Sequence, residues 1–581
     1  MSRSPIFYFF ALLLFISSGI IFQSCQTDTT DIFPERIHVR IPADPERLNP
    51  MLSRSGYATQ IEELIFSGLL YQNPYSLEIE PMLAESLPEI ETGIEMDGKE
   101  LTAYTYVIRE DVTWEDGSSV TAQDYLFTKK LALNPYVPAA SWKNFLSFLH
   151  KIELHPDNDR KLTAYVDSDF ILSMEISGTF SIYPEYHYDP NGIMRDFDYE
   201  ALKNYEEGDF TEEQEEALKL LADAFGSARL NVEQISGSGP YQLIMYETGQ
   251  TISLSKKENW WGEDVLQPGP ESIHFFIIPD EATALSALKE GSIHLMSEVS
   301  PTYFRDLKED ASTSAQFNFH TPPLLELYYL AMNNDHPFFS DKNSRRAIAK
   351  LLDTEFLIKE LMEGYAEPLS TILHPSNPYY HSGLEPIKMN LRAADSLLTL
   401  AGWTDSDGDG IRDKEIDGEK MDLHITIDIS GGEIGRQTAL VFQEAAEKTG
   451  IKVDINQREF RLIRQDLSNR NFHITPLVLR QNTYKTDLFQ NWHSDAARPG
   501  GNNVSGFSHP EVDELIMQIR RTEDDDALRE MYHQIQEIIY EEQPVILMMA
   551  PKERLVVNNQ FDILISAVRP GYILHTARKA G

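Results

Sequence analysis

The acidic run Asp-Ser-Asp-Gly-Asp-Gly is the part of the sequence whose residue types and spacing could bind a cation. It places Asp405, Asp407 and Asp409 at alternate positions and ends on Gly410. Carboxylates at every second residue can converge on one hard cation, as they do in a calcium loop. The twelfth position, where such a loop needs a glutamate, is Ile416. We therefore favour a glycine-rich surface turn, and a structural calcium site is the alternative.

Residues that could carry out catalysis lack the spacing that catalysis needs. The 16 histidines include no His-Glu-x-x-His pair for zinc. The chain also has no Gly-x-Ser-x-Gly elbow for a nucleophilic serine and no phosphate-binding loop. We expect neither an enzyme nor a bound cofactor, and an exported hydrolase is kept as an alternative.

The single cysteine, Cys25, directly follows an export-like segment. Arg3 supplies a positive charge, and residues 6–22 are almost entirely apolar. This run is short for a bilayer-spanning helix and has no basic segment on its far side. Residues 1–25 resemble a bacterial lipoprotein signal peptide, which implies that Cys25 is acylated and that residues 26–36 form a tether to the membrane.

The charge balance restricts the partners of the protein. Fifty basic residues against 92 acidic residues leave a formal net charge of −42. Such a chain repels phosphate backbones, so we expect no nucleic-acid partner. Solubility explains most of the charge, and a preference for cationic solutes is the weaker alternative.

Strands and helices are predicted to alternate along most of the chain. Alternating or buried apolar residues indicate strands, and capping residues followed by apolar positions at helical spacing indicate helices. The strands are expected at 37–41, 241–246, 251–255, 273–278, 327–332, 421–429, 451–455 and 545–549, and the helices at 57–66, 122–133, 344–352 and 433–448. This alternation predicts an α/β fold with mixed sheets.

Several short strings occur in an order that is similar to one family, the large peptide-, nickel- and saccharide-binding receptors of ABC importers. The strings are Leu48-Asn49-Pro50, residues 65–69, 81–86, 106–109, 114–117, 121–124, 237–241 and 260–262, and in the second half residues 330–334, 345–348, 401–403 and 510–515. The strings are distributed along most of the chain after residue 36.

The resemblance implies a two-lobe fold of the kind found in periplasmic binding proteins, with a hinge and an extra subdomain in the first lobe. The first lobe would comprise residues 37–320 plus 545–581, and the second lobe residues 321–544. The ligand would be enclosed between them, and closure over it would be the functional step.

The function implied is that of a substrate-binding receptor of an ABC importer. It would capture an oligopeptide or a similar small solute and deliver it to the permease subunits. The lipid on Cys25 would anchor it as a monomer in the periplasmic space or at the cell surface. An exported sensor or adhesion lipoprotein of the same fold is the alternative from another functional class.

The resemblance also suggests ligand-binding residues in the second lobe. The binding-cleft segment should fall around Trp492 and His493, with Asp487 before it and Asn502 after it. In peptide-binding relatives an aspartate just upstream grips the free amine of the ligand through a charge-assisted bond. Residues 481–484 contain no acid here. Asp487 could replace that acid or could form a structural hydrogen bond, and the sequence leaves both open.

Three further residues are candidate ligand contacts. Tyr484 lies in the same segment of the second lobe. Asn49 and Tyr57 belong to the opening loop of the first lobe, which approaches the ligand in relatives.

Overall fold

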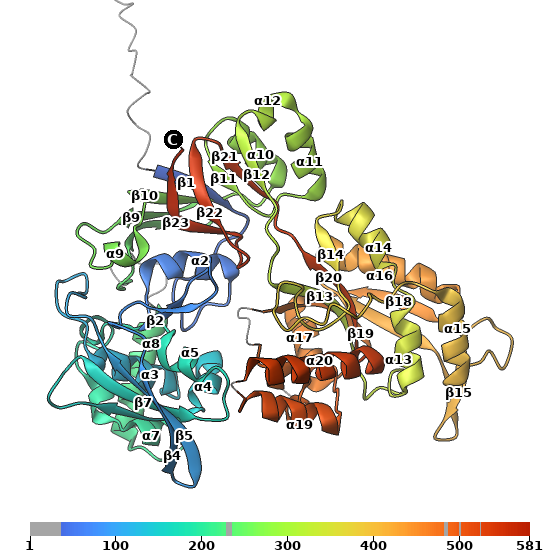
Figure 1. The fold of residues 1–581 in the computed structure, drawn as a ribbon, viewed down its shortest axis with the longest axis horizontal. Coiled ribbons are helices and arrows are strands. Elements are labelled where there is room, and N and C mark those ends of the chain that lie inside the picture. Colours follow the sequence, from blue (N-terminus) through green and yellow to red (C-terminus); the bar gives the residue numbers. More distant parts are fainter. Residues whose placement is uncertain (1–35, 228–234, 482–485, 499–500, 523, 581) are drawn as a thin grey trace, which may run out of the picture.

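The protein folds into two α/β lobes that stand side by side (Figure 1). The computed structural model describes residues 36–227, 235–481, 486–498, 501–522 and 524–580. A large hydrophobic core lies in the first lobe, and a separate core, which includes Leu330 and Trp403, lies in the second. The predicted α/β fold with two lobes and mixed sheets is confirmed.

The first lobe is built around a seven-stranded mixed sheet. Ile37, Val39 and Ile41 of its central strand are fully or almost fully buried, which accounts for their alternation in the sequence. In spatial order the strands are β12 (Phe317–His320), β21 (Leu555–Asn558), β11 (Leu295–Met296), β1 (Arg36–Ile41), β10 (Ser272–Ile277), β9 (Thr251–Lys256) and β8 (Tyr241–Glu247).

Helices and two small hairpins complete this part of the lobe. The helices are α2 (Gly56–Ile65), α9 (Glu263–Leu266), α10 (Glu281–Lys289), α11 (Pro301–Glu309) and α12 (Ala311–Ser314). The hairpins are β2 (Leu70–Gln72) with β3 (Ile79–Pro81) and β22 (Phe561–Ile565) with β23 (Tyr572–Lys579).

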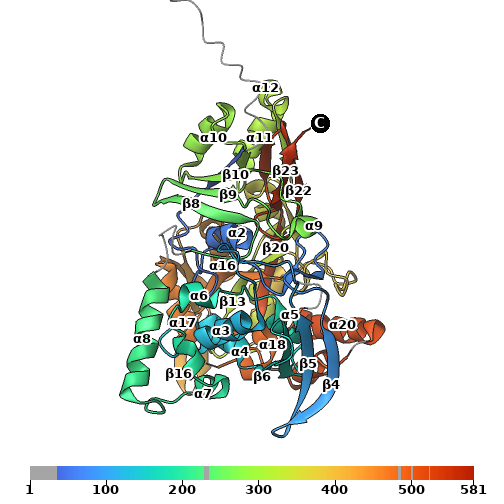
Figure 2. The ribbon, with the colours of Figure 1, turned by 90° about the vertical axis from the view of Figure 1, so that its left-hand side faces the viewer.

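An extra subdomain lies below the seven-stranded sheet, as Figure 2 shows. Its sheet has the order β4 (Glu89–Met96), β5 (Lys99–Val107), β7 (Lys161–Asp167) and β6 (Leu149–Leu154). Its helices are α3 (Ala122–Leu133), α4 (Ala140–Leu146), α5 (Ser173–Gly178), α6 (Glu185–Tyr188), α7 (Tyr199–Lys203) and α8 (Glu212–Ser227). It shares one continuous hydrophobic core with the first sheet.

The second lobe has a six-stranded mixed sheet. Its order is β14 (Ala366–Pro368), β20 (Val545–Pro551), β13 (Glu326–Met332), β19 (Ile474–Arg480), β17 (His424–Ile429) and β18 (Lys452–Gln457), with a separate hairpin of β15 (Asp413–Ile416) and β16 (Glu419–Asp422). Its helices are α13 (Lys342–Ala349), α14 (Thr354–Phe356), α15 (Leu391–Leu400), α16 (Glu433–Glu447), α17 (Phe460–Asn469), α18 (Phe489–Trp492), α19 (Pro510–Ile519) and α20 (Asp525–Glu542).

Two short segments connect the lobes, one around Leu324 and one around Glu553, and they run side by side. The Leu324 amide donates to the Pro551 carbonyl at 3.0 Å, and the Glu553 amide donates to the Pro322 carbonyl at 2.8 Å. The second connection therefore follows β20. The expected assignment of 545–551 to the first lobe is wrong, because these residues pair with β13 and β14 of the second sheet.

The start of helix α3 is a case in which capping residues in the sequence predict where a helix begins. The Asp124 carboxylate accepts a hydrogen bond from the Thr121 amide at 2.9 Å, so the expected capping box is present. The helix runs from Ala122 to Leu133, as predicted.

A buried lysine is the unusual feature of α3. Lys129 is fully buried, and its ammonium nitrogen has no hydrogen-bond partner among the residues that the structure describes. It lies 4.8 Å from the ring centre of Tyr125, 5.7 Å from that of Trp142 and 4.6 Å from that of Phe180. Burial lowers the pKa of Lys129 to about 7, because the rings replace only part of its hydration.

We expect Lys129→Met to stabilise the protein at neutral pH. The folded state holds the Lys129 proton less tightly than the unfolded state, so Lys129 costs stability below pH 7, and this cost disappears as the pH rises toward 10.5. The gain should be on the order of 2 to 5 kcal/mol at pH 7 and should shrink steadily by pH 10. Urea unfolding of both proteins at several pH values measures it, and a gain that is independent of pH would contradict the explanation.

Candidate functional site

A cavity at the joint between the lobes is the first part of the candidate site. We name it the hinge cavity, and its volume is about 290 Å³. The first lobe contributes most of its wall, and the second lobe contributes Arg480 at the end of β19. The lining residues are Arg40, Ile41, Gly56, Tyr57, Gln60, Ser297, Glu298, Arg480, Arg569 and Pro570. A solute in this cavity would touch both lobes.

A network of ion pairs centred on Glu326 crosses the joint beside this cavity. Arg569, on the loop between β22 and β23, donates to both carboxylate oxygens of Glu326, at 2.9 and 2.8 Å. Arg480, which faces Glu326 across the β13–β19 ladder, donates at 3.2 Å. Arg569 also lies 3.3 Å from Glu298 and 3.6 Å from Glu553. The network thus ties the C-terminal hairpin of the first lobe to the second sheet.

The electrostatics of Glu326 follow from this geometry. Burial alone would raise the pKa of Glu326, but the hydrogen bonds and positive charge of Arg569 and Arg480 hold it below its ordinary value. Arg480 keeps most of its guanidinium free, because 59% of its side chain is exposed and only Nε is bonded to Glu326.

A second cavity adjoins the hinge cavity, since Gln60, Arg569 and Pro570 line both. We name it the first-lobe chamber, and its volume is about 420 Å³. Its walls come from α2, residues 66–74, Trp142, residues 179–181 and the 568–575 segment, among others. Apolar rings and a few polar groups make up this wall, as is typical of small-molecule sites.

Of the predicted contacts in the first lobe, Tyr57 lines the hinge cavity and Asn49 supports the opening loop. The Tyr57 hydroxyl donates to the Glu298 carboxylate at 3.1 Å. The Asn49 side chain is buried and accepts hydrogen bonds from the Tyr183 hydroxyl at 2.9 Å and the Met51 amide at 3.1 Å.

Asp487 is engaged inside the second lobe. Both of its carboxylate oxygens face Arg520, at 3.1 and 2.7 Å, and both side chains are about 5% exposed. The Phe489 ring lies 4.2 Å from the Arg520 guanidinium. Of the two roles that the sequence left open, this geometry matches the structural one.

The remaining predicted residues of the second lobe lie apart from the two cavities. Trp492 packs in the core formed with α19 and α20. His493 is buried and stacks on the Phe489 ring at 4.3 Å. Asn502 is exposed to solvent. Tyr484 and Cys25 lie outside the described residues.

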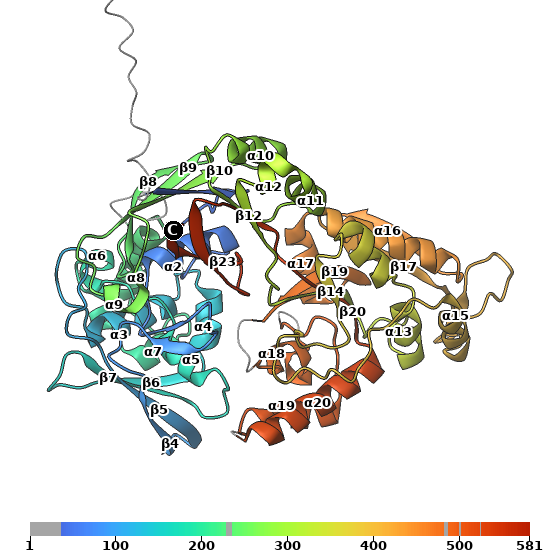
Figure 3. The same cartoon turned by 45° about the horizontal axis from the view of Figure 1, so that its top comes forward.

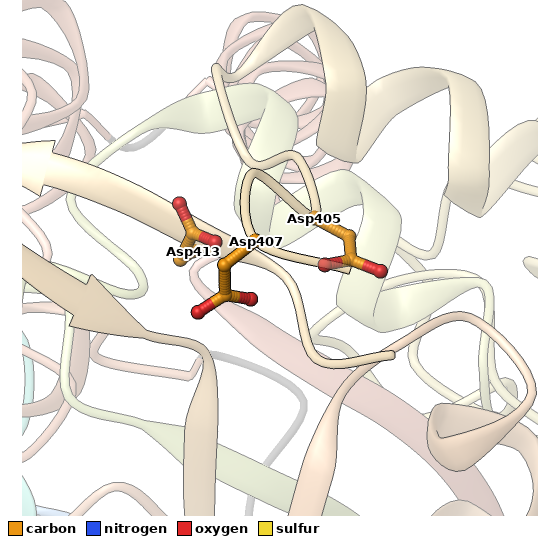
Figure 4. A group of neighbouring side chains, drawn as sticks. All are labelled: Asp405, Asp407 and Asp413. Carbon is orange, nitrogen blue, oxygen red and sulfur yellow. The ribbon is translucent and has the colours of Figure 1, made fainter. Parts of the chain in front are cut away.

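The acidic turn before β15 brings together a different set of aspartates from the predicted one. Asp405 and Asp407 approach Asp413 of β15, and their oxygens lie within 4.8 Å of one another, as Figure 4 shows. Asp409 is not in this group and accepts instead from the Ile411 amide at 2.8 Å. The Lys420 ammonium pairs with Asp407 and lies 3.5 Å from Asp413. The group therefore already has a cation from the protein itself.

A third cavity lies at the end of the lobes opposite the joint. We name it the far cavity, and its volume is about 920 Å³. The extra subdomain lines one side, mainly from β4, β5 and the segment 167–175. Residues 519–522, Leu528 and Tyr532 of the second lobe line the other. Figure 3 shows α19 and α20 facing β4 and β5 across this region. The lobes therefore meet at both ends.

Among the described residues, none of the helices has the length and apolar character that crossing a membrane requires.

The chain has the architecture of a two-lobe solute-binding protein. It has two α/β lobes with separate cores, two connecting segments and a charged cavity at the joint. The chain belongs to the bacterial extracellular solute-binding proteins of family 5, because the model of that family's middle region matches residues 78–500. This is a family of substrate-binding proteins and not of enzymes, so the predicted family and binding function are confirmed.

Curated relatives match the chain over nearly its whole length. The oligopeptide-binding protein AppA of Bacillus subtilis is 24% identical over 543 residues, which is 92% of this chain and 88% of AppA. The dipeptide-binding protein of Escherichia coli is 22% identical over 522 residues, with 87% of each chain covered.

Solved structures show the same fold. AppA from Bacillus subtilis, in complex with a nonapeptide, superposes with a TM-score of 0.71 at 22% identity and covers 94% of this chain and 99% of its own. NikA from Brucella suis, in complex with Fe(III)-EDTA, gives 0.72 at 20% identity, with coverage of 94% and 100%. Because these two proteins hold very different ligands, the shared fold leaves the ligand to be decided by the side chains in the cavities.

We expect Asp487→Ala to destabilise the protein by about 3 to 5 kcal/mol, because it leaves the buried Arg520 charge without a partner. Urea unfolding of the ligand-free protein measures the change. The double variant Asp487→Leu with Arg520→Met, which removes both charges, should recover most of the loss. A loss below about 1 kcal/mol in the single variant would show that the pair has no structural role.

Proposed function

We propose that this protein is the receptor of an ABC importer and that it captures a peptide or a similar small solute between its lobes for delivery to the permease. The main observation in support is the hinge cavity, which has Arg480 from one lobe and Tyr57, Arg40 and Arg569 from the other in its wall. Only a solute that touches both lobes favours the closed form, so such a cavity can couple binding to closure.

Contacts at the far end of the lobes support the closing motion. Arg521, two residues after the end of α19, pairs through two nitrogens with Asp169 of the extra subdomain. The neighbouring Arg520 guanidinium lies 5.7 Å from the Phe170 ring, and Ile171 packs against the core of α18–α20. These three neighbouring residues of the extra subdomain form the contact that must break when the lobes separate there.

The residue types of the N-terminal segment support a proposal for the cellular location. We propose that residues 1–25 direct export, that Cys25 carries the lipid anchor and that residues 26–36 tether a monomeric receptor to the membrane. The family description, extracellular solute-binding proteins, agrees with an exported receptor. A permease then meets the closed receptor at the membrane surface.

Peptide binding should stabilise the soluble domain that starts after Cys25. A ligand present at one hundred times its Kd adds about 2.7 kcal/mol to the folded state, so the melting temperature should rise by several degrees. Pools of di- to pentapeptides at millimolar concentration provide the test. X-ray scattering on a stabilising pool should give a radius of gyration no larger than that of the free protein. A complete absence of stabilisation would contradict peptide capture.

Reversing one charge at the far end should weaken binding of a stabilising peptide pool. Asp169→Arg places two positive charges together across the lobes and favours the open form, so affinity should fall by about two- to tenfold. The swap Asp169→Arg with Arg521→Asp restores opposite charges and should recover the affinity. Titration calorimetry of the three proteins decides this, and equal affinities would show that the contact does not influence closure.

A further inference from the structure

Glu63 on α2 is a carboxylate without a partner in the wall of the first-lobe chamber. Its side chain is open to the chamber. Among the described residues it forms neither a hydrogen bond nor an ion pair. Its side chain is exposed, and the protein around it raises its pKa. Its neighbour Glu62 differs, since it accepts a hydrogen bond from the Ser53 hydroxyl at 2.5 Å. An unpartnered carboxylate in a ligand chamber is therefore specific to Glu63 on this turn of the helix.

A second polar group in the same wall also lacks a partner. The Ser67 hydroxyl oxygen is buried and has no hydrogen-bond partner in the described part of the chain, although Ser67 lines the chamber. Buried polar groups are normally satisfied, because leaving them bare costs free energy. The same wall thus holds the exposed Glu63 carboxylate and the buried Ser67 hydroxyl, both without a partner among the described residues.

The cations around the chamber do not neutralise Glu63. Arg569 is the only lysine or arginine among the described residues that line it, and the network with Glu326, Glu298 and Glu553 already occupies its guanidinium. His575 also lines the chamber, but burial lowers its pKa to about 4 and keeps the ring neutral. The chamber therefore has an uncompensated negative charge when Glu63 is ionised.

Aromatic rings in the wall suit a cation as well. Trp142 and Phe180 stack at 4.4 Å between ring centres, and both line the chamber together with Tyr71. The faces of such rings attract ammonium groups. Lys129 lies beside the first two rings, yet it is not part of the wall, and its lowered pKa weakens its competing charge.

We propose that Glu63, assisted by the Ser67 hydroxyl, binds an ammonium group of the ligand. This step rests on the function proposed above and gives that site a substrate class, namely solutes with a primary ammonium. In the second lobe, residues 481–484 contain no acidic residue, and Asp487 forms an ion pair with Arg520. The amine-binding carboxylate would thus belong to the first lobe in this chain. Either the α-ammonium of a peptide or the ammonium of a lysine side chain could fill the position.

Affinity selection with defined pools tests this proposal. The soluble wild-type domain and the Glu63→Gln variant are each incubated with a tripeptide pool in three forms: unmodified, N-acetylated with lysine present, and N-acetylated without lysine. Retained peptides are identified by mass spectrometry and titrated by calorimetry. Glu247→Gln, on the exposed end of β8, is the matched control for the loss of one negative charge.

We expect Glu63→Gln to bind the retained peptides about ten- to a hundredfold more weakly, since a hydrogen bond to a charged partner is lost. Glu247→Gln should bind as the wild type does. Retention of the N-acetylated pool with lysine would assign the site to a side-chain ammonium, and retention of the unmodified pool alone would assign it to the α-ammonium.

The outcomes that overturn the two proposals differ. Equal affinity of wild type and Glu63→Gln, or equal retention of the N-acetylated pool without lysine, would overturn the role of Glu63 and leave peptide capture standing. No retention of any pool by the wild type would overturn peptide capture itself. A melting temperature of ligand-free Glu63→Gln several degrees below that of the wild type would show that Glu63 has a structural partner.

Discussion

The buried carboxylate of Glu326 is the interaction on which the arrangement of the two lobes depends. It starts the first strand of the second lobe, immediately after the chain has crossed from the first, and Arg569 of the C-terminal hairpin holds both of its oxygens. A carboxylate buried in this way is stable only when it is paired. The pairing therefore fixes where the lobes meet and places Arg480 and Arg569 in the wall of the hinge cavity.

This constraint explains why charged side chains lie together at the joint. Each lobe buries its own apolar core and needs little from the other. What remains between them is a set of cavities whose walls combine charges with aromatic rings. Charges inside such walls interact more strongly than on the surface, because little water screens them. A receptor can thus be acidic overall and still recognise a solute by a few local groups.

The predicted ligand-binding segment of the second lobe and the wall of the first-lobe chamber differ in how their polar groups are paired. The segment expected to grip the ligand is built into the core of the second lobe through Asp487, Trp492 and His493. In the first-lobe chamber, Glu63 on α2 and Ser67 just after it have no partner among the described residues. Tyr57, which the family resemblance suggested, lines the adjoining hinge cavity, and Glu63 lies on the same predicted helix.

The sequence by itself determined the α/β fold, the two-lobe family and most of the elements, because periodicity and capping are local properties, as the Thr121–Asp124 cap shows. Tertiary structure alone decided the site. Glu326 and Arg480 are 154 positions apart, and Glu326 and Arg569 are 243 apart. No spacing rule connects such residues, since only strand pairing and the return of the chain across the joint bring them together. The same return placed β20 in the second sheet, which sequence periodicity could not assign to either lobe.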